Sequence, residues 1–147
     1  MQTTENPKTA SVLFKEFLET VGKGDAKAAS SLFATDGYID APYVQSLGFP
    51  SKIAGHEAIE QSLSQVKAAA PNFHFSNFKV VMETPNELVA EYESEAVMAS
   101  GKPYKQLYIA HVTTKDGKIV SHKEFLNTVV FVEAFFPNGL KDLITNK

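Results

Sequence analysis

The sequence has no cysteine, no long apolar run and no block of basic residues, and each absence excludes a class of protein. Without cysteine there are no disulfides, thiolate metal sites or cysteine nucleophiles. No segment reaches the roughly 18 unbroken apolar residues of a membrane-spanning helix, and Met1 to Ala10 lacks the apolar core of a signal peptide. The 14 basic and 17 acidic side chains are interspersed, so the sequence contains no basic cluster that could bind the phosphate backbone of a nucleic acid. We therefore expect a cytoplasmic protein with neither a membrane nor a nucleic-acid partner.

What is present fits one globular domain over residues 1–147. At this length, with 44% hydrophobic residues, the chain can bury a hydrophobic core without needing a disulfide or a structural metal ion. The first half shows the end signals of three helices. Asn6-Pro7 favours the start of the first helix and Gly22 its end, Asp25 can cap a second helix through Phe33, and a third follows Gly55.

After Pro71 the spacing of apolar residues changes from helical to alternating. Four strands are predicted over residues 73–82, 87–99, 104–114 and 118–132, and Asp116-Gly117 is a strong signal for a two-residue hairpin turn. Helices followed by antiparallel strands indicate an α+β domain, with the helices packed on one face of a curved antiparallel sheet.

A two-residue turn at Asp116-Gly117 predicts the pairing of the last two strands. It places His111 opposite His122 and Ile109 opposite Glu124. Because side chains alternate, one face would then carry His111, His122, Glu124, Leu107, Ile109 and Leu126, and the other Gln106, Tyr108, Phe125 and Asn127. A β-bulge in either strand would break this assignment beyond it.

Glu124 is the most informative position in this hairpin. A carboxylate on an apolar surface loses hydration, which favours its neutral form and suits it to general acid or base catalysis. The structural alternative is a strand-end glutamate paired with a lysine or histidine at the sheet margin. Two imidazoles and a carboxylate also suit zinc or iron, but without a recognised further ligand we expect no metal.

Other residues are candidates for the walls of a pocket. Asp40, before Ala41-Pro42, fits a base at the pocket mouth or a turn carboxylate that accepts backbone hydrogen bonds. The tyrosines fit either a core with an outlet for each hydroxyl or a ligand-lining wall. The candidate ligand-binding residues are Tyr43, Phe78, Tyr104, Ile109, Leu126 and Asn127.

Several short segments resemble a known superfamily. Gly24-Asp25, the run from Leu32 to Gly37, Gly55-His56-Glu57-Ala58-Ile59 and Asp116-Gly117-Lys118-Ile119 are similar in order and spacing to the nuclear-transport-factor-2-like proteins, among them SnoaL-like polyketide cyclases and ketosteroid-isomerase-like proteins. Pro71-Asn72-Phe73 and Glu124-Phe125-Leu126-Asn127 resemble the phenazine-biosynthesis A/B-type proteins more closely. The resemblance implies a cone-shaped α+β barrel with a deep apolar pocket, and a homodimer formed through the outer face of the sheet.

The resemblance transfers functional residues unevenly. Glu124 occupies the position of the acid-base glutamate of the phenazine-type proteins, but Ser62 and Val66 stand where those proteins have a histidine and a serine. Ala41 and Phe17 replace the base and the tyrosine of ketosteroid isomerases, which argues against steroid isomerisation. His111 with Glu124 or Asn127 is a rough counterpart of the histidine and aspartate of SnoaL-like cyclases.

These observations lead to one functional hypothesis and one rival. The hypothesis is a small, largely apolar ligand and cofactor-free cyclisation, isomerisation or dehydration of a polyketide-like or cyclic carbonyl compound. Glu124 would carry the proton, His111 or His122 would set its charge, and Asn127, Tyr104 or Asp40 would orient the substrate. The rival is a small-molecule-binding or dimeric interaction module without catalysis, so whether the protein is an enzyme stays open.

Overall fold

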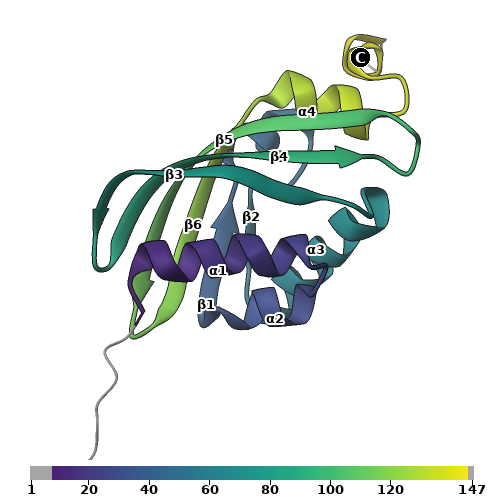
Figure 1. The fold of residues 1–147 in the computed structure, drawn as a ribbon. Helices are drawn as coiled ribbons and strands as arrows, with labels where there is room; N and C mark the ends of the chain where they lie inside the picture. Colours follow the sequence, from purple (N-terminus) through teal and green to yellow (C-terminus); the bar gives the residue numbers. More distant parts are fainter. Residues whose placement is uncertain (1–7, 146–147) are drawn as a thin grey trace, which may run out of the picture.

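A computed structural model describes residues 8–145, which form one curved six-stranded sheet with helices packed against it (Figure 1). The strand order is β2-β1-β6-β5-β4-β3, and every pairing is antiparallel except that of β1 with β6. The elements are α1 (Ala10–Gly22), α2 (Ala26–Ser31), β1 (Phe33–Asp40), the 3-10 helix η1 (Pro42–Leu47), β2 (Lys52–Ala54), α3 (His56–Ala69), β3 (His74–Thr84), β4 (Glu87–Val97), β5 (Pro103–Lys115), β6 (Lys118–Leu126), α4 (Thr128–Phe135) and α5 (Leu140–Thr145).

The three helices that precede β3 confirm the prediction for the first half of the chain. The hydroxyl of Thr9 caps α1, while the predicted signal Asn6-Pro7 lies outside the described residues. Asp25 caps α2 as predicted, accepting from the Ala28 amide at 3.0 Å. This helix ends at Ser31 rather than Phe33, because Phe33 already belongs to β1.

The end of the chain differs from the prediction of a strand over residues 118–132. That strand stops at Leu126, and Asn127 caps α4 by accepting hydrogen bonds from the amides of Val129 and Val130. The β-branched residues of this segment favour a strand locally, but the cap and the packing of Val130 and Ala134 against a hydrophobic cluster override that preference.

Two hydrophobic clusters lie on the inner face of the sheet, which is the face covered by the helices. The larger one joins α1, α3 and the strands and includes the predicted apolar stripe of α1, with Phe14 and Phe17 almost fully buried. Burying each such side chain stabilises the fold by about 1.5–3 kcal/mol. The smaller cluster lies beneath α4 and consists of Ala70, Ala96, Met98, Tyr104 and Ala134.

The turn between β5 and β6 forms as predicted, but the register changes two pairs beyond it. Asp116 and Gly117 both have positive φ, and Thr114 pairs with Ile119 as the turn requires. The next pair is Thr113 with Ser121, so Val120 is the extra residue of a bulge. The predicted pairs of His111 with His122 and of Ile109 with Glu124 are therefore wrong.

The cause of the bulge is the strand on the other side of β6. Ile119 donates its amide to the Leu32 carbonyl at 2.9 Å, and the β1–β6 register shifts between Phe33 and Tyr38. The strands approach so closely there that a Cβ on Gly37 would lie 2.7 Å from the Ile119 carbonyl oxygen. The β5–β6 hairpin pattern contains no information about β1, which is why the pairing rule failed.

The shift reverses the faces predicted for the hairpin. His122 pairs with Val112 and Glu124 with Ala110, on the inner face, while His111 pairs with Lys123 and Ile109 with Phe125, on the outer face. A change of one residue in register moves every later side chain to the opposite face. Gln106 and Tyr108, predicted on the same face as Phe125, are instead buried inside.

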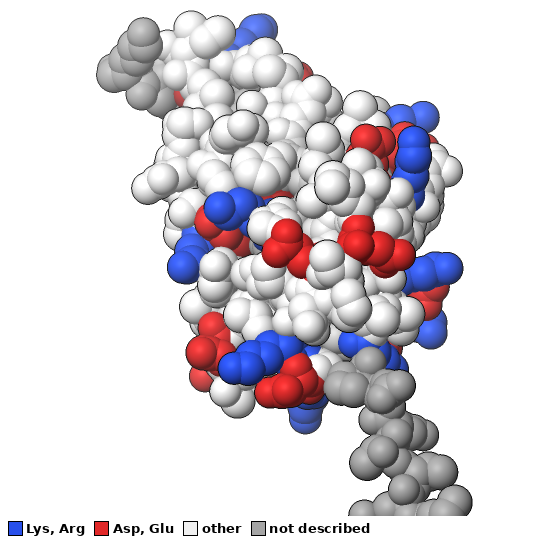
Figure 2. Space-filling model, turned by 90° about the vertical axis from the view of Figure 1, so that its left-hand side faces the viewer, with Lys and Arg blue, Asp and Glu red and all other residues white. Residues whose placement is uncertain are grey.

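Figure 2 shows lysine and acidic side chains interleaved over the face that it presents. Within residues 8–145 no helix has the length and apolar character needed to cross a membrane.

Candidate functional site

A hydrogen-bonded group of three side chains lies on the inner face where β4, β5 and β6 run together. The Tyr92 hydroxyl donates to Glu124 Oε1 at 2.6 Å. His122 Nε2 lies 3.2 Å from the same hydroxyl and 3.5 Å from Glu124 Oε1. We call Tyr92, His122 and Glu124 the inner triad.

The hydrogen bonds of the inner triad determine which nitrogen of His122 carries its proton. Tyr92 has one hydroxyl proton, and the short contact to Glu124 uses it, so the hydroxyl oxygen accepts from His122 Nε2–H. Nδ1 of His122 is buried without a partner among the described residues. A proton there would be unsatisfied, which places the ring proton on Nε2. His122 is thus a fixed donor that orients Tyr92.

Burial separates the three members of the inner triad. The His122 side chain is 3% exposed and packs edge-on against Phe14 and Phe17, whose ring centroids lie 4.8 and 5.5 Å away. The Glu124 side chain is 16% exposed. Burial, and next the charge of Glu124, hold the pKa of Tyr92 well above its usual range, so Tyr92 stays a neutral donor. Glu124 is therefore the member that a ligand can reach.

A small residue allows Tyr92 to reach Glu124 across the strand between them. Tyr92 is on β4 and Glu124 on β6, and Ala110 of β5 pairs with both Ala90 and Glu124. Ala110 is fully buried and leaves room for the tyrosine ring, which stacks on Tyr108 at 4.7 Å between centroids. A larger residue at position 110 would occupy this passage.

A second set of polar side chains lies beside the inner triad, and we call the hydroxyls of Ser94, Tyr108 and Tyr104, together with the Gln106 amide, the hydroxyl chain. The Ser94 and Tyr108 hydroxyls are 2.7 Å apart, those of Tyr108 and Tyr104 also interact, and Gln106 Nε2 donates to Tyr104 at 3.0 Å. Burial raises the pKa of Tyr104 to about 12, and burial raises that of Tyr108 well above its usual range. All four side chains are almost fully buried.

Gln106 connects this chain to the start of α4. Its Oε1 accepts from the Asn127 amide at 2.8 Å, and its Nε2 donates to the Asn127 carbonyl at 2.9 Å. The Gln106 amide therefore replaces a backbone partner where the β5–β6 ladder has ended. Asn127, predicted to bind ligand, is exposed and uses its side-chain oxygen to cap α4.

Of the four predicted catalytic residues, the structure brings together only His122 and Glu124. His111 lies on the outer face, 3.5 Å from Glu87. Asp40 pairs with Lys123 and Lys52 and shares their outer face, away from Glu124. The pairing of β1 with β2 and β6 determines which way the Asp40 carboxylate points, and the nearby Pro42 does not.

The predicted ligand-binding residues are similarly divided between the two faces. Phe78 and Leu126 pack against the main inner cluster, and Tyr104 belongs to the smaller one. Tyr43 is 56% exposed and Ile109 is 49% exposed, so both lie outside. Sequence reasoning assigned no site role to Ser94 or Gln106, and it left Tyr92 and Tyr108 among the tyrosines that fit either a core or a pocket wall. The alternation of three glutamates with Tyr92 and Ser94 on β4 was the signal that could have placed these two inside.

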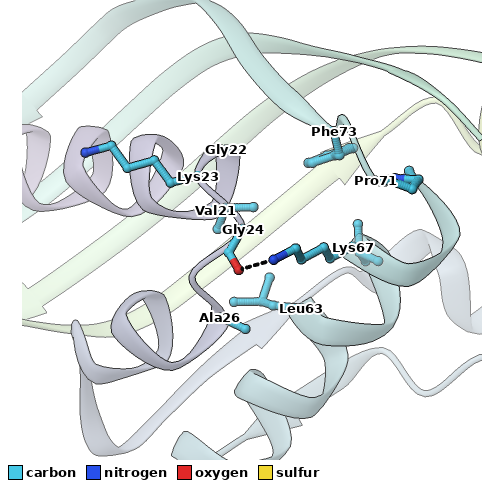
Figure 3. A pocket seen from close by; sticks show the side chains of 11 residues that line it. Val21, Gly22, Lys23, Gly24, Ala26, Leu63, Lys67, Pro71 and Phe73 are labelled. Atoms are coloured by element: carbon cyan, nitrogen blue, oxygen red, sulfur yellow. Dashed lines mark hydrogen bonds between the residues drawn. The ribbon is translucent and has the colours of Figure 1, made fainter.

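Two hollows lie elsewhere in the structure, and neither is lined by His122 or Glu124. A cavity of about 60 Å³ lies between the ends of α1 and α3 and the start of β3, where Lys67 donates to the Gly24 carbonyl at 3.0 Å (Figure 3). A groove of about 580 Å³ crosses the outer face of β3 to β6, with Leu107, Ile109 and Phe125 in its lining. Among residues 8–145, no three His, Asp or Glu side chains converge on a point where they could hold a metal ion.

Known proteins share this arrangement of elements. The sequence profile of the SnoaL-like domain family matches residues 14–122. The uncharacterised protein YesE of Bacillus subtilis (strain 168) is 29% identical over 126 residues, covering 82% of this chain and 83% of YesE. A Bacillus subtilis protein provisionally assigned as an isomerase superposes with a TM-score of 0.77 at 26% identity, over 86% of this chain and 91% of that one. A phenazine biosynthesis-related protein from Pseudomonas aeruginosa does so with a TM-score of 0.73 at 22% identity, over 85% and 83% of the two chains, which shows a shared fold.

Proposed function

This chain belongs to the SnoaL-like domain family, and on that premise we propose that it binds a small, largely apolar molecule on the inner face of its sheet and moves a proton there. The reaction is a cofactor-free isomerisation, cyclisation or dehydration of a polyketide-like or cyclic carbonyl compound. The similarity to a Bacillus subtilis protein provisionally assigned as an isomerase supports this class of chemistry.

The observation that carries the proposal is the half-buried Glu124 with Tyr92 as its fixed hydrogen-bond donor. Glu124 Oε1 is held by the Tyr92 hydroxyl at 2.6 Å, which orients the carboxylate and leaves Oε2 without a hydrogen-bonding partner among the described residues. A carboxylate oriented in apolar surroundings and within reach of a ligand suits a general base. His122 takes no proton in this scheme and acts as a positioning residue, holding Tyr92 through Nε2–H.

The proton transfer needs no group outside the chain. Glu124 removes a proton from a carbon next to the ligand carbonyl, the electron pair of that C–H bond forms the enolate double bond, and the proton returns to a second carbon or to the same one. Return to the same carbon in deuterated water gives exchange, which reports the base without requiring the natural substrate.

The experiment is proton exchange on a cyclic ketone with acidic C–H bonds, β-tetralone, followed by proton NMR in deuterated water. We expect the wild-type protein to accelerate exchange and Glu124→Gln to lose about 10²–10⁴-fold of that acceleration. The variant keeps an oxygen that can accept from Tyr92, so its fold should survive. Glu83→Gln, which replaces an exposed glutamate on β3, is the matched control and should match the wild type.

The result also separates the two readings of the site. Ketone binding without accelerated exchange in the wild type would contradict the catalytic role and favour a binding module. Equal exchange by the wild type and Glu124→Gln would remove Glu124 from the reaction.

We further propose that the outer face of the sheet joins two copies of the chain. Leu107 is 63% exposed and Ile109 49% exposed beside the outer groove, and exposed apolar patches of this kind mark interaction sites. Glutamates 91, 93 and 95 and lysines 79, 105 and 123 share this face. A twofold axis places the same patch on both sides, so acidic residues of one copy can meet lysines of the other.

A further inference from the structure

The inner face of the sheet is closed in this structure, so a ligand can enter only if one of its covers moves. The residues of the hydroxyl chain are 1% to 6% exposed, and the Glu124 side chain is 16% exposed. Neither of the two hollows described above is lined by Glu124. Enzymes commonly admit ligands to closed sites by the opening of a loop or helix. The cover that opens is expected to be the one held by the least buried apolar surface.

The helices over the inner face are attached to different extents. α1 packs against α2 and against strands β3 to β6, and α3 packs against α2, β1 and β2. α4 packs mainly on β5 and α5. Its almost fully buried side chains are Val132 and Ala134, against five such side chains in α1. Because buried apolar area supplies most of the attachment of a helix, α4 is the easiest of these covers to lift.

The C-terminal end of α4 is held by one lysine. Lys102 lies between β4 and β5, and its Nζ donates to the carbonyls of Glu133, Phe136 and Pro137 at 3.1, 2.8 and 3.1 Å. Carbonyls at the end of a helix lack partners within the helix, and the helix dipole there attracts a cation. A lysine ammonium has three protons, so these three acceptors use all of them. Lys102 thus ties α4, and the chain leading to α5, to the β4–β5 turn.

The N-terminal end of α4 is fixed more firmly. Gln106, which is 1% exposed, bonds to both backbone groups of Asn127, and the Asn127 side chain caps the helix. Two of the three Lys102 bonds are exposed, so water can replace the partners when they separate. The bonds around Gln106 have less access to water and are costlier to break. α4 is therefore expected to open at its C-terminal end and to pivot at Asn127.

Lifting α4 would uncover the part of the inner face that leads to Glu124. The Phe135 ring of α4 packs edge-on against the Tyr104 ring, with 5.3 Å between centroids. Burial chiefly raises the pKa of Tyr104, and the charge of Glu124 adds to it, so the two groups lie within electrostatic range of each other. Phe49 contacts Phe131 of α4 at 5.5 Å between centroids, but Phe49 is 40% exposed and holds the helix only lightly.

We propose that α4 and α5 form a lid over the inner face, hinged at Asn127 and latched by Lys102, and that its opening admits a small apolar ligand to Glu124. The inference rests on the proposed function, because it takes the inner face as the ligand site. Lys102 acts through α4 and is a positioning residue. A latch made of an ammonium and surface carbonyls can release to water, whereas the apolar contacts of α1 cannot.

Hydrogen–deuterium exchange followed by mass spectrometry measures how often α4 opens. Lys102→Met keeps the aliphatic stem of the side chain and removes its three donors. We expect this variant to speed exchange of the α4 amides about tenfold or more, since hydrogen bonds to a charged group are lost, and to leave the α1 amides unchanged. Lys105→Met removes a lysine of β5 whose side chain is 79% exposed, and as the matched control it should change neither helix.

Thiol labelling measures whether a small aromatic molecule then reaches the inner face. Because the chain has no cysteine, a single introduced thiol reports alone. Ala96→Cys places the thiol in the smaller cluster beneath α4, and Leu88→Cys places it in the larger cluster that α1 covers. With the uncharged aromatic disulfide dithiodipyridine, Lys102→Met should speed labelling at position 96 about tenfold or more and leave labelling at position 88 unchanged.

The two positions separate a lid from a general loss of stability. Equal acceleration at both thiols would mean that Lys102 stabilises the whole fold, and acceleration at neither would mean that Lys102 latches nothing; either result overturns the lid. Faster amide exchange in α4 without faster labelling at position 96 would overturn it as well, because α4 would move without opening the inner face. None of these measurements uses β-tetralone or a variant of Glu124, so the lid and the proton transfer can fail independently.

Discussion

The two faces of β4, β5 and β6 both carry polar side chains, but the partners and distances of these side chains differ between the faces. On the inner face, Tyr92, Ser94 and Gln106 have partners at 2.6 to 3.2 Å. On the outer face, the nearest approach of Lys105 to Glu95 is 3.5 Å and that of His111 to Glu87 is also 3.5 Å, between side chains that are 43% to 79% exposed. Neighbouring residues of the same strands thus belong to two different environments.

The difference follows from access to water, which hydrates the polar groups of the outer face and not those of the inner face. A polar group inside has no solvent to bond with, so its position is determined by its partner. A charged group outside is hydrated whether or not it is paired, so its ion pair contributes little. Function is therefore more readily inferred from the inner hydrogen bonds than from the larger number of outer charges.

Alkaline pH should lower the free energy of unfolding through the buried tyrosines of the inner face, and this is the largest effect that we expect. Tyr92, Tyr104 and Tyr108 have folded-state pKa values above the usual 10.0, with Tyr104 at about 12. Below about pH 10 both states hold these protons and stability is unaffected. Above it the unfolded chain releases them and the native chain does not, so the free energy of unfolding falls by about 1.4 kcal/mol per pH unit for each tyrosine, until pH passes the folded pKa.

Urea unfolding at a series of pH values from about 9 to 11, followed by circular dichroism, measures this fall. Tyr104→Phe is the control, since it removes one of the three contributors and should make the fall shallower. A free energy of unfolding that stays constant over this range would mean that the tyrosines are not buried as described.

A larger side chain at position 110 should destabilise the fold by disturbing the inner face locally. Ala110→Leu fills the passage by which Tyr92 reaches Glu124, and overpacking of this kind costs about 1–3 kcal/mol. Ile109→Leu, at the neighbouring exposed position, should change the free energy of unfolding by less than about 0.5 kcal/mol. Urea unfolding of both variants measures the difference. Equal effects would contradict the assignment of the two residues to opposite faces.

Substitutions on the outer face should change the association of two chains rather than the free energy of unfolding of each chain. Ile109→Lys places a charge in the outer groove, which should separate the proposed dimer and leave the stability of the single chain within about 0.5 kcal/mol. Sedimentation at micromolar concentration measures the change, with Glu83→Gln as a control outside the groove. A wild-type protein that sediments only as a 16.1 kDa species would rule out the dimer.

The sequence predicted most elements because their signals are local. The Asp25 cap, the apolar stripe containing Phe14 and Phe17, and the Asp116-Gly117 turn each act within a few residues of themselves, and each was found as predicted. The α4 helix was missed because its β-branched residues favour a strand and its stabilising contacts come from a distant cluster.

The candidate site was only partly predictable for a related reason. Glu124 was identified from its position in the hairpin and from the family resemblance, but its partners were assigned by a pairing rule that assumes an unbroken ladder. The bulge at Val120 moved His111 away from the face of Glu124 and replaced its predicted strand partner Ile109 with Ala110. Tyr92 reaches Glu124 from two strands away, and nothing in the sequence near either residue indicates that the two side chains meet.

The sequence by itself determined the three helices before β3, the hairpin turn and the presence of a carboxylate near the end of the last strand, because these depend on neighbours in the chain. Only the tertiary structure decided which face that carboxylate occupies. The register of β6 is held by its contacts with β1 and Leu32 as well as by its turn with β5, and one inserted residue reverses every side chain beyond it. Contacts between residues far apart in the chain therefore placed Tyr92 beside Glu124 and His111 on the opposite face.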